Sequence, residues 1–382
     1  MEYVRLKDIG RIITGNTPPT SKPEYYGDYM PFIKATDISL GTKCTLVTEQ
    51  MYSELAAEKY NESLVPKGST CVVTIGSIGK KMTYAHTDLF VNQAINAIIP
   101  KDSYDNEYVF YNVKYSVLPQ LKKLDSGTTS GRENVSKSSF SSIRIPVIKD
   151  KRVQHRIASI LSTYDTLIEN NTKRIRLLEK MAENLYKEWF VRFRFPGHEK
   201  VEMENGLPKG WKVKRYEDEL NVKYGKGLPT NRLTEDGFPV FGSNGQIGFY
   251  TSYMYDTPQI LISCRGASSG VVNISLPKSF VTNNSLVCEL TDKTESVFEY
   301  LKYYFLNTNL VQYQTGSAQP QITINNVVKL KMLVPSHEVQ CAFSKKIRVI
   351  DKEVANLQNQ NSLLTRQRDL LLPRLMSGKL EI

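Results

Sequence analysis

Apolar residues recur at alternating steps of four and three residues along two segments of the chain, and the second segment repeats the first 186 residues later. This spacing is the heptad pattern of a helix that packs along most of its length on another helix. Any fold of this chain must therefore accommodate two long helices with matching seams. The first seam is Ile157, Leu161, Tyr164, Ile168, Asn171, Ile175, Leu178, Ala182, Leu185 and Trp189, and the second is Phe343, Ile347, Ile350, Val354, Leu357, Asn361, Leu364, Arg368, Leu371 and Leu375.

Each seam contains one asparagine, Asn171 in the first and Asn361 in the second. A buried asparagine lowers stability but fixes the register and orientation of the paired helices. The alternative is that both side chains face solvent where the seam is imperfect. Pro196-Gly197 is expected to stop the first helix, and Pro373 to bend or end the second near its last turn.

Shorter matches extend the repeat outside the helices, at an offset that drifts slowly as small insertions and deletions would make it drift. They predict an internal duplication with globular domains at residues 1–149 and 197–336, and with helical segments at 150–196 and 337–382. The matches are Phe90-Val91 with Phe280-Val281, Tyr108 and Tyr111 with Tyr300 and Tyr303, Gly127 with Gly316, Ile145-Pro146 with Val334-Pro335, and Asp165 with Asp351.

Both globular segments have the pattern of mixed α/β domains. Short runs rich in β-branched residues predict strands at 70–75, 94–99, 259–263 and 285–290, and helices are expected at 104–121 and 296–310. The predicted fold class is α+β, with two such domains separated by an antiparallel coiled coil and related by a pseudo-two-fold axis. A helix of about 40 residues spans roughly 60 Å, so the domains are expected at opposite ends of a rod.

The charge suggests a polyanionic partner. The chain has 382 residues and a net charge of +11, of which residues 151–200 and 336–382 carry +8. The five cysteines include no CxxC pair, which favours a reduced cytoplasm, and no apolar run is long enough to cross a membrane. A two-fold protein with diverged domains matches a bipartite, asymmetric DNA target whose gap is set by the helices.

These features resemble the specificity subunit of type I restriction-modification systems over essentially the whole chain. The resemblance is carried by Gln154-His155-Arg156-Ile157-Ala158 through Asp165 and Ile168 to Leu185-Tyr186-Lys187-Glu188-Trp189-Phe190, by Leu371-Leu372-Pro373-Arg374-Leu375-Met376-Ser377-Gly378-Lys379, and by Ile13-Thr14-Gly15-Asn16-Thr17-Pro18.

The resemblance implies two target recognition domains on a two-helix spacer, and no chemistry in this chain. It implies two modification subunits, which use S-adenosylmethionine to methylate adenine in double-stranded DNA. It also implies that two restriction subunits, which use ATP and Mg²⁺, can join them and cut unmodified DNA.

No catalytic or cofactor motif emerges from the sequence itself. Asn16-Thr17-Pro18-Pro19 lacks the spacing and the aromatic residue of an adenine methyltransferase motif, and Tyr224-Gly225-Lys226-Gly227 is too short for a nucleotide-binding turn. The four histidines lack the spacing of metal ligands. The sequence therefore predicts no catalytic residue, no cofactor and no metal in this chain.

Candidate DNA contacts lie in loops near the ends of strands, where basic and amide side chains can reach phosphates and base edges. For each of them a solvated surface residue is the alternative. The candidates are Lys80, Lys81, Arg132 and Asn134 in the first domain, and Asn244, Gln246, Arg265, Gln319 and Gln321 in the second.

Two other functions compete with this interpretation. A pseudo-dimeric repressor would bind a bipartite site tightly without a partner. A coiled-coil scaffold would bind no nucleic acid. The aromatic residues Trp189, Phe190, Phe193 and Phe195 exceed what a two-helix seam needs, so they are expected to pack on the second domain, to bind a modification subunit, or to close the end of the rod.

Overall fold

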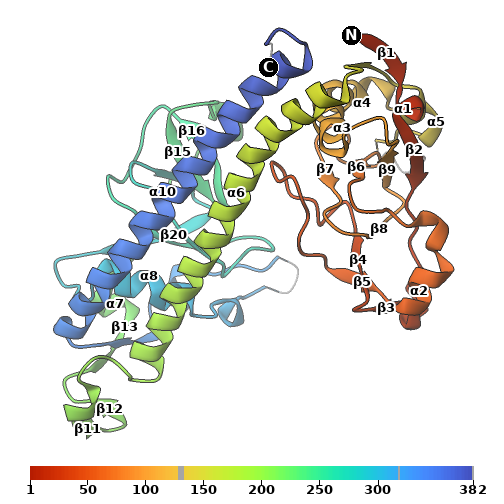
Figure 1. Cartoon of the computed structure of the whole chain (residues 1–382). Coiled ribbons are helices and arrows are strands. Elements are labelled where there is room, and N and C mark those ends of the chain that lie inside the picture. Colours follow the sequence, from red (N-terminus) through yellow and green to blue (C-terminus); the bar gives the residue numbers. More distant parts are fainter. Residues whose placement is uncertain (128–132, 317–318, 381–382) are drawn as a thin grey trace. The chain divides into compact units, whose positions relative to one another are not determined.

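A computed structural model of the chain describes residues 1–127, 133–316 and 319–380. The chain divides into two compact units (Figure 1). Unit 1 contains Met1–Arg174 together with the chain from Leu357 onward, and unit 2 contains Ile175–Asn356. Each unit therefore holds one globular domain and a segment of each long helix. No helix in the described ranges is long and apolar enough to cross a membrane.

The two long helices are α6 (Lys151–Tyr186), which continues as a π-helical turn over Lys187–Val191, and α10 (His337–Met376). All the residues of both predicted seams are buried or half-buried. α10 continues through Pro373 and ends within the next turn, where Gly378 takes a positive φ of 68°. α10 therefore ends near Pro373, as expected, because proline has no N–H to donate to the helical hydrogen bonds.

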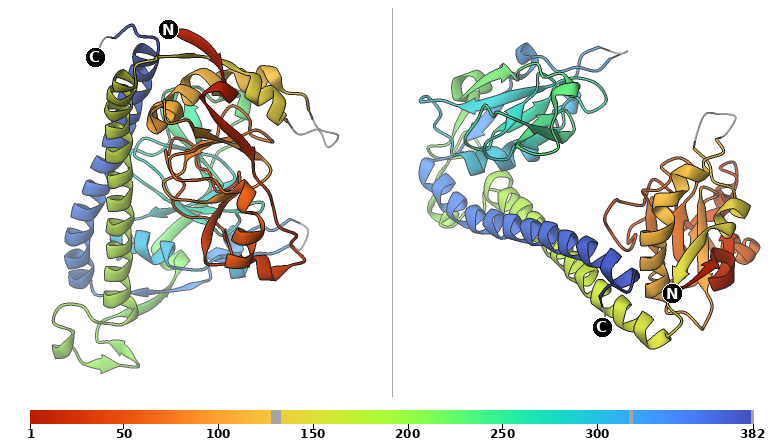
Figure 2. Two further views of the ribbon diagram at one scale, coloured as in Figure 1. Left: turned by 45° about the vertical axis from the view of Figure 1, so that its right-hand side comes forward. Right: turned by 90° about the horizontal axis from the view of Figure 1, so that it is seen from above.

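Within unit 1 the helices pair in antiparallel fashion, with α10 beside the start of α6 (Figure 2). Asn171 Nδ2 donates to Gln360 Oε1 at 3.3 Å, and Asn361 Nδ2 donates to Thr172 Oγ1 at 3.3 Å. Both seam asparagines therefore bond across the helix pair. The alternative that they merely face solvent is wrong, because Asn171 is only 7% exposed and Asn361 is half-buried.

Domain 1 is built from two small sheets, with strand orders β2-β9-β6-β7 and β3-β5-β4-β8, and a separate pair β1-β10. All the strand pairs are antiparallel except β4 with β8. Its strands are β1 (Glu2–Arg5), β2 (Gly10–Thr14), β3 (Tyr26–Gly27), β4 (Met30–Ile33), β5 (Gln50–Tyr52), β6 (Thr70–Val73), β7 (Met82–Tyr84), β8 (Phe90–Val91), β9 (Ile95–Pro100) and β10 (Arg144–Val147). Its helices are α1 (Leu6–Ile9), α2 (Glu54–Lys59), α3 (Asn106–Asn112), α4 (Leu118–Leu121) and α5 (Lys137–Ser142).

Domain 2 repeats this topology with one strand fewer among the described residues, with sheet orders β14-β20-β17-β18 and β16-β15-β19 and the pair β13-β21. Here β15 and β19 form the parallel pair that corresponds to β4 and β8. Its strands are β13 (Lys212–Arg215), β14 (Leu220–Tyr224), β15 (Phe238–Gly242), β16 (Gly245–Tyr250), β17 (Ile260–Ser263), β18 (Val272–Ile274), β19 (Phe280–Val281), β20 (Ser285–Leu290) and β21 (Lys331–Val334). Its helices are α7 (Tyr216–Glu219), α8 (Phe298–Leu306) and α9 (Ile324–Val327), and a hairpin of β11 (Met203–Glu204) and β12 (Leu207–Pro208) precedes these sheets along the chain.

Local sequence explains the central strands of these sheets. β6 and β17 are short runs rich in Val, Ile and Thr whose every residue is buried, as β-branched side chains favour. The strands predicted at 70–75, 94–99, 259–263 and 285–290 coincide with β6, β9, β17 and β20. The helix expected at 104–121 is α3 and α4 joined by a π-helical turn at Val113–Val117, and it begins where the Asp105 side chain accepts from Tyr108 N.

One helix of each domain, α3 in unit 1 and α8 in unit 2, contributes aromatic residues to the core that the domain shares with the helix pair of its own unit. In unit 1, Tyr108 and Tyr111 share a core with Ile157 and Leu161 of α6 and with Leu375 of α10. In unit 2, the equivalent aromatic helix packs with the end of α6 and the start of α10. That core includes Tyr300, Tyr303, Trp189, Phe190, Phe195, Trp211, Phe343 and Ile347, so the additional aromatic residues that follow α6 pack on domain 2.

A polar contact between a tyrosine of the domain and an aspartate of a long helix is repeated in both units. Tyr111 Oη donates to Asp165 in unit 1, and Tyr303 Oη donates to Asp351 at 3.3 Å in unit 2. The cation that balances the aspartate differs. In unit 1 it is Arg368 of α10, itself a seam residue, whereas in unit 2 it is Lys302 of α8 at 2.8 Å.

Candidate nucleic-acid interface

Loops of domain 1 gather at the ends of strands β2, β4, β6 and β8, and we call them loop cluster 1 (residues 15–18, 34–49, 75–81, 92–94 and 125–135, of which 128–132 lie outside the described residues). Backbone hydrogen bonds join them: Asn16 N donates to Val91 O at 2.9 Å, Asn92 N to Ile33 O at 3.0 Å, and Thr74 N to Ala94 O at 2.8 Å. The contact requires glycine at position 15, because a Cβ there would lie 2.1 Å from Val91 O.

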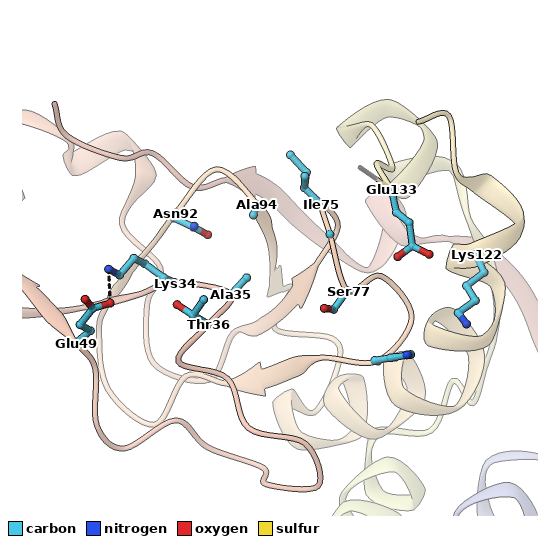
Figure 3. A pocket seen from close by; sticks show the side chains of 12 residues that line it. Lys34, Ala35, Thr36, Glu49, Ile75, Ser77, Asn92, Ala94, Lys122 and Glu133 are labelled. Carbon is cyan, nitrogen blue, oxygen red and sulfur yellow. Dashed lines mark hydrogen bonds and ion pairs between the residues drawn. The ribbon is translucent and has the colours of Figure 1, made fainter. Parts of the chain in front are cut away.

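Loop cluster 1 encloses a pocket of about 770 Å³ (Figure 3). Lys34 and Glu49 form an ion pair of 2.6 Å on one side, and Lys122 and Glu133 lie on the other. Asn92 lies at the pocket, and its buried Oδ1 has no hydrogen-bond partner among the described residues. The pocket therefore combines three lysines, which suit phosphate, with an amide that suits a base edge, and the carboxylates of Glu49 and Glu133 offset part of the positive charge.

The structure brings three of the four candidates of domain 1 to loop cluster 1. Lys80 is exposed and lines the pocket, whereas Lys81 turns inward and donates from Nζ to Ala35 O at 3.0 Å. Asn134 pairs with Ile75 as an isolated β-bridge and donates from its backbone N to Asp125 Oδ1 at 2.8 Å. Arg132 lies outside the described residues.

Domain 2 carries an equivalent set, loop cluster 2 (residues 225–229, 243–244, 265–270, 282–284 and 314–321, without the undescribed 317–318). Lys226 N donates to Val281 O at 2.9 Å, Thr282 N to Phe241 O at 2.9 Å, and Cys264 N to Asn284 O at 3.0 Å. A Cβ at Gly225 would lie 2.3 Å from Thr282 O, as at Gly15. The two clusters therefore share one backbone framework but carry different side chains.

All the candidates of domain 2 lie in or beside loop cluster 2, and all are exposed. Arg265 forms a β-bridge with Gln321, just as Ile75 does with Asn134. Asn244 Oδ1 accepts from Ser268 Oγ, and Gln246 Nε2 lies 3.4 Å from Gly248 O. Gln319 precedes Pro320, whose carbonyl O accepts from Gly266 N at 3.1 Å. These residues were predicted to lie near strand ends. The amides at 92–93 and 283–284 were not predicted, although a Phe-Val dipeptide comes directly before residue 92 and before residue 282.

The string Asn16-Thr17-Pro18-Pro19 lies in loop cluster 1 and has a structural role. Tyr52 Oη donates to Asn16 O at 2.9 Å, and Tyr26 Oη donates to Pro18 O at 2.8 Å. Two buried or half-buried tyrosines therefore hold this loop against the sheet β3-β5-β4-β8.

Two loop clusters on a repeated domain, with a pair of helices packed on each domain, are the architecture of a protein with two equivalent recognition surfaces. The sequence model of the type I restriction modification DNA specificity domain matches residues 1–180 and 208–366. The chain belongs to this family, as the resemblance indicated, and is the non-catalytic DNA recognition component of a type I restriction-modification system.

Individual relatives extend over the chain. It is 28% identical to the type I restriction enzyme MjaIX specificity subunit of Methanocaldococcus jannaschii, over 99% of this chain and 93% of that protein. It is 32% identical to the HindI specificity subunit of Haemophilus influenzae, over 47% of this chain and 38% of that protein. The fold is similar to the crystal structure of the S subunit from M. genitalium, with a TM-score of 0.59 at 19% identity over 98% and 95% of the two chains.

Proposed function

We propose that this subunit reads a bipartite, asymmetric target in double-stranded DNA, one half-site with each loop cluster. The observation that supports this is the shared backbone framework of the two clusters together with their different side chains. A common framework docks both domains on DNA in the same manner, whereas different side chains select different bases. The candidate contacts that we assign to this role are Lys80, Lys81, Arg132, Asn134, Asn244, Gln246, Arg265, Gln319 and Gln321.

The helical segments 150–196 and 337–382 are the proposed spacer between recognition domains at 1–149 and 197–336. In this proposal α6 and α10 form an antiparallel coiled coil with a pseudo-two-fold axis across it, and their length sets the gap between half-sites. The seam asparagines that bond across the helices of unit 1 support a fixed register.

Two modification subunits supply the chemistry in this proposal, and they methylate adenine with S-adenosylmethionine that they bind themselves. With two restriction subunits, which use ATP and Mg²⁺, recognition of the same target sequence directs cleavage. Both activities take place on DNA in the cytoplasm.

The test compares methylated adenines across the genome in cells with the intact chain and in cells without it. We expect a two-part motif to be methylated only when the chain and its modification subunit are both present. Methylation by the purified chain alone would contradict the proposal. Tight binding of a two-part site without the modification subunit would favour the repressor, and failure of the complex to bind any duplex at low salt would favour the scaffold.

A further inference from the structure

Two short segments follow the parallel strands β8 and β19 and occupy equivalent places in the two loop clusters. They are Asn92–Ala94 in domain 1 and Thr282–Asn284 in domain 2. Each contains two amide side chains, Asn92 and Gln93 in the first segment and Asn283 and Asn284 in the second. The amide side chain is the protein group that matches the donor and acceptor of adenine in the major groove.

Backbone groups of both segments form hydrogen bonds within the protein. In domain 1, Asn92 N donates to Ile33 O, Asn92 O accepts from Ile95 N at 3.0 Å, and Ala94 O accepts from Thr74 N. In domain 2, Thr282 N donates to Phe241 O, Thr282 O accepts from Ser285 N at 3.1 Å, and Asn284 O accepts from Cys264 N. A ligand at either segment must therefore be recognised by side chains, which rigid backbones hold in place.

Some of these side chains lack partners in the protein. Asn92 Oδ1 and Thr282 Oγ1 are buried without a hydrogen bond among the described residues, which is a costly state for a polar atom. Gln93 and Asn284 are the exposed members of the two segments. Thr17 Oγ1 donates to Gln93 Oε1, which orients that amide and leaves its Nε2 and one lone pair of Oε1 available.

We propose that Gln93 and Asn284 each read one adenine, Gln93 in the half-site of domain 1 and Asn284 in that of domain 2. The inference rests on the proposed function and adds the specificity-determining residues. The amide oxygen accepts from adenine N6 and the amide nitrogen donates to N7. Thr17 is a positioning residue for Gln93. Gln93 and Asn284 do not occupy equivalent positions. Ala94 O and Asn284 O accept equivalent backbone hydrogen bonds, so Asn284 corresponds to Ala94, one residue after Gln93.

The experiment uses nearly isosteric variants, Gln93→Glu and Asn284→Asp, in the full chain bound to its modification subunit. The probes are duplexes that keep the wild-type two-part site except for one half-site, which is randomised. A carboxylate accepts from cytosine N4 but has no donor for adenine N7, so we expect a single position to change preference from adenine to cytosine. Affinity for the original site should fall about 10- to 100-fold, as a bidentate base contact implies.

Each variant should alter only its own half-site, and the two variants should alter opposite halves. Thr17→Val should broaden the preference at the Gln93 position without switching it. The control is Asn205→Asp, which adds the same charge on the exposed turn between β11 and β12 and should leave both preferences unchanged.

Charge repulsion alone would weaken binding to all sequences and leave the base preference unchanged in both half-sites, and that result overturns the inference. If the wild-type complex itself selects no two-part sequence, the proposed function and this inference both fail. If it selects one and the variants do not change it, only the inference fails.

Discussion

Arg368 of α10 forms an ion pair with Asp165 of α6 in which the two side chains are only 3% and 4% exposed. Asp165 also accepts from the hydroxyl of Tyr111, so this buried carboxylate joins domain 1 to both long helices of unit 1. Asp351, the equivalent aspartate of unit 2, is 32% exposed and pairs with Lys302 of its own domain. The two halves therefore hold their helices with different polar contacts.

Replacing Arg368 should destabilise unit 1 strongly. Arg368→Ala leaves Asp165 buried without its cation, and breaking a buried pair in this way costs about 3–5 kcal/mol. Lys302→Ala is the matched control, because a partly exposed pair contributes only about 0–1 kcal/mol. Urea unfolding of both variants measures the difference. Equal losses of stability would show that the burial of Asp165 has no energetic consequence.

Acid should weaken unit 2 through Glu299. Burial by itself would raise the pKa of Glu299, but hydrogen bonds from Arg348 and Ser344 lower it below the ordinary value of 4.5. Because the pKa is lower in the folded state, its contribution to stability is present above about pH 4.5 and is lost as the pH falls through the folded pKa. Between pH 5 and pH 3, a range of about two units around the reference pKa, the melting temperature of Glu299→Gln should therefore fall less than that of the wild-type protein. Glu204→Gln, an exposed control, should keep the wild-type slope.

The salt dependence of DNA binding should report phosphate contacts of the loop clusters. Lys80→Ala or Arg265→Ala should each reduce the slope of log K against log salt by about 1, with a uniform loss of affinity across sequences. Lys200→Ala removes an exposed cation from the segment between α6 and β11, outside loop cluster 2, and should leave the slope unchanged. An unchanged slope in Lys80→Ala or Arg265→Ala would remove that residue from the interface.

Lengthening both helices by one heptad should lengthen the gap between half-sites. Insertions after Arg174 and after Asn356, where the two units meet along the chain, preserve the seam register. Seven helical residues add about 10 Å, which corresponds to about three base pairs at 3.4 Å each. Mapping of methylated adenines should then find the same half-sites with a wider gap. A gap of the original length contradicts the spacer model, and a seven-residue insertion in α6 alone should abolish methylation by breaking the register.

The long helices and the repeated domains were predictable because the sequence contains a heptad spacing and an internal repeat. The heptad spacing places Ile157 and Phe343 in their cores, and the paired tyrosines at 108 and 111 and at 300 and 303 mark the helices on which the domains pack. The sequence did not predict the role of Arg368, since a charged residue in a seam is ordinarily an imperfection. Its burial follows from Asp165, and no local pattern joins two residues so far apart.

The candidate interface was predictable only in outline. Gly- and Ser-rich turns indicated where the loops lie, because such residues permit tight turns near strand ends. Sequence could not separate Lys80, which is exposed, from Lys81, whose Nζ is held by Ala35 O. It also missed the amides of 92–93 and 283–284, because only the parallel pairing of β8 with β4 and of β19 with β15 brings those segments to the loop clusters.

The unequal partners of the two aspartates determine which half of the chain can be copied into the place of the other. Moved to the second position, domain 1 and its helix would set Asp165 against Ala182, the counterpart of Arg368, and would bury a carboxylate without a cation. Moved to the first position, domain 2 would bring Lys302 with it and still meet Arg368. A copy of the first half in the second place should therefore require a compensating cation at position 182, whereas a copy of the second half in the first place should not.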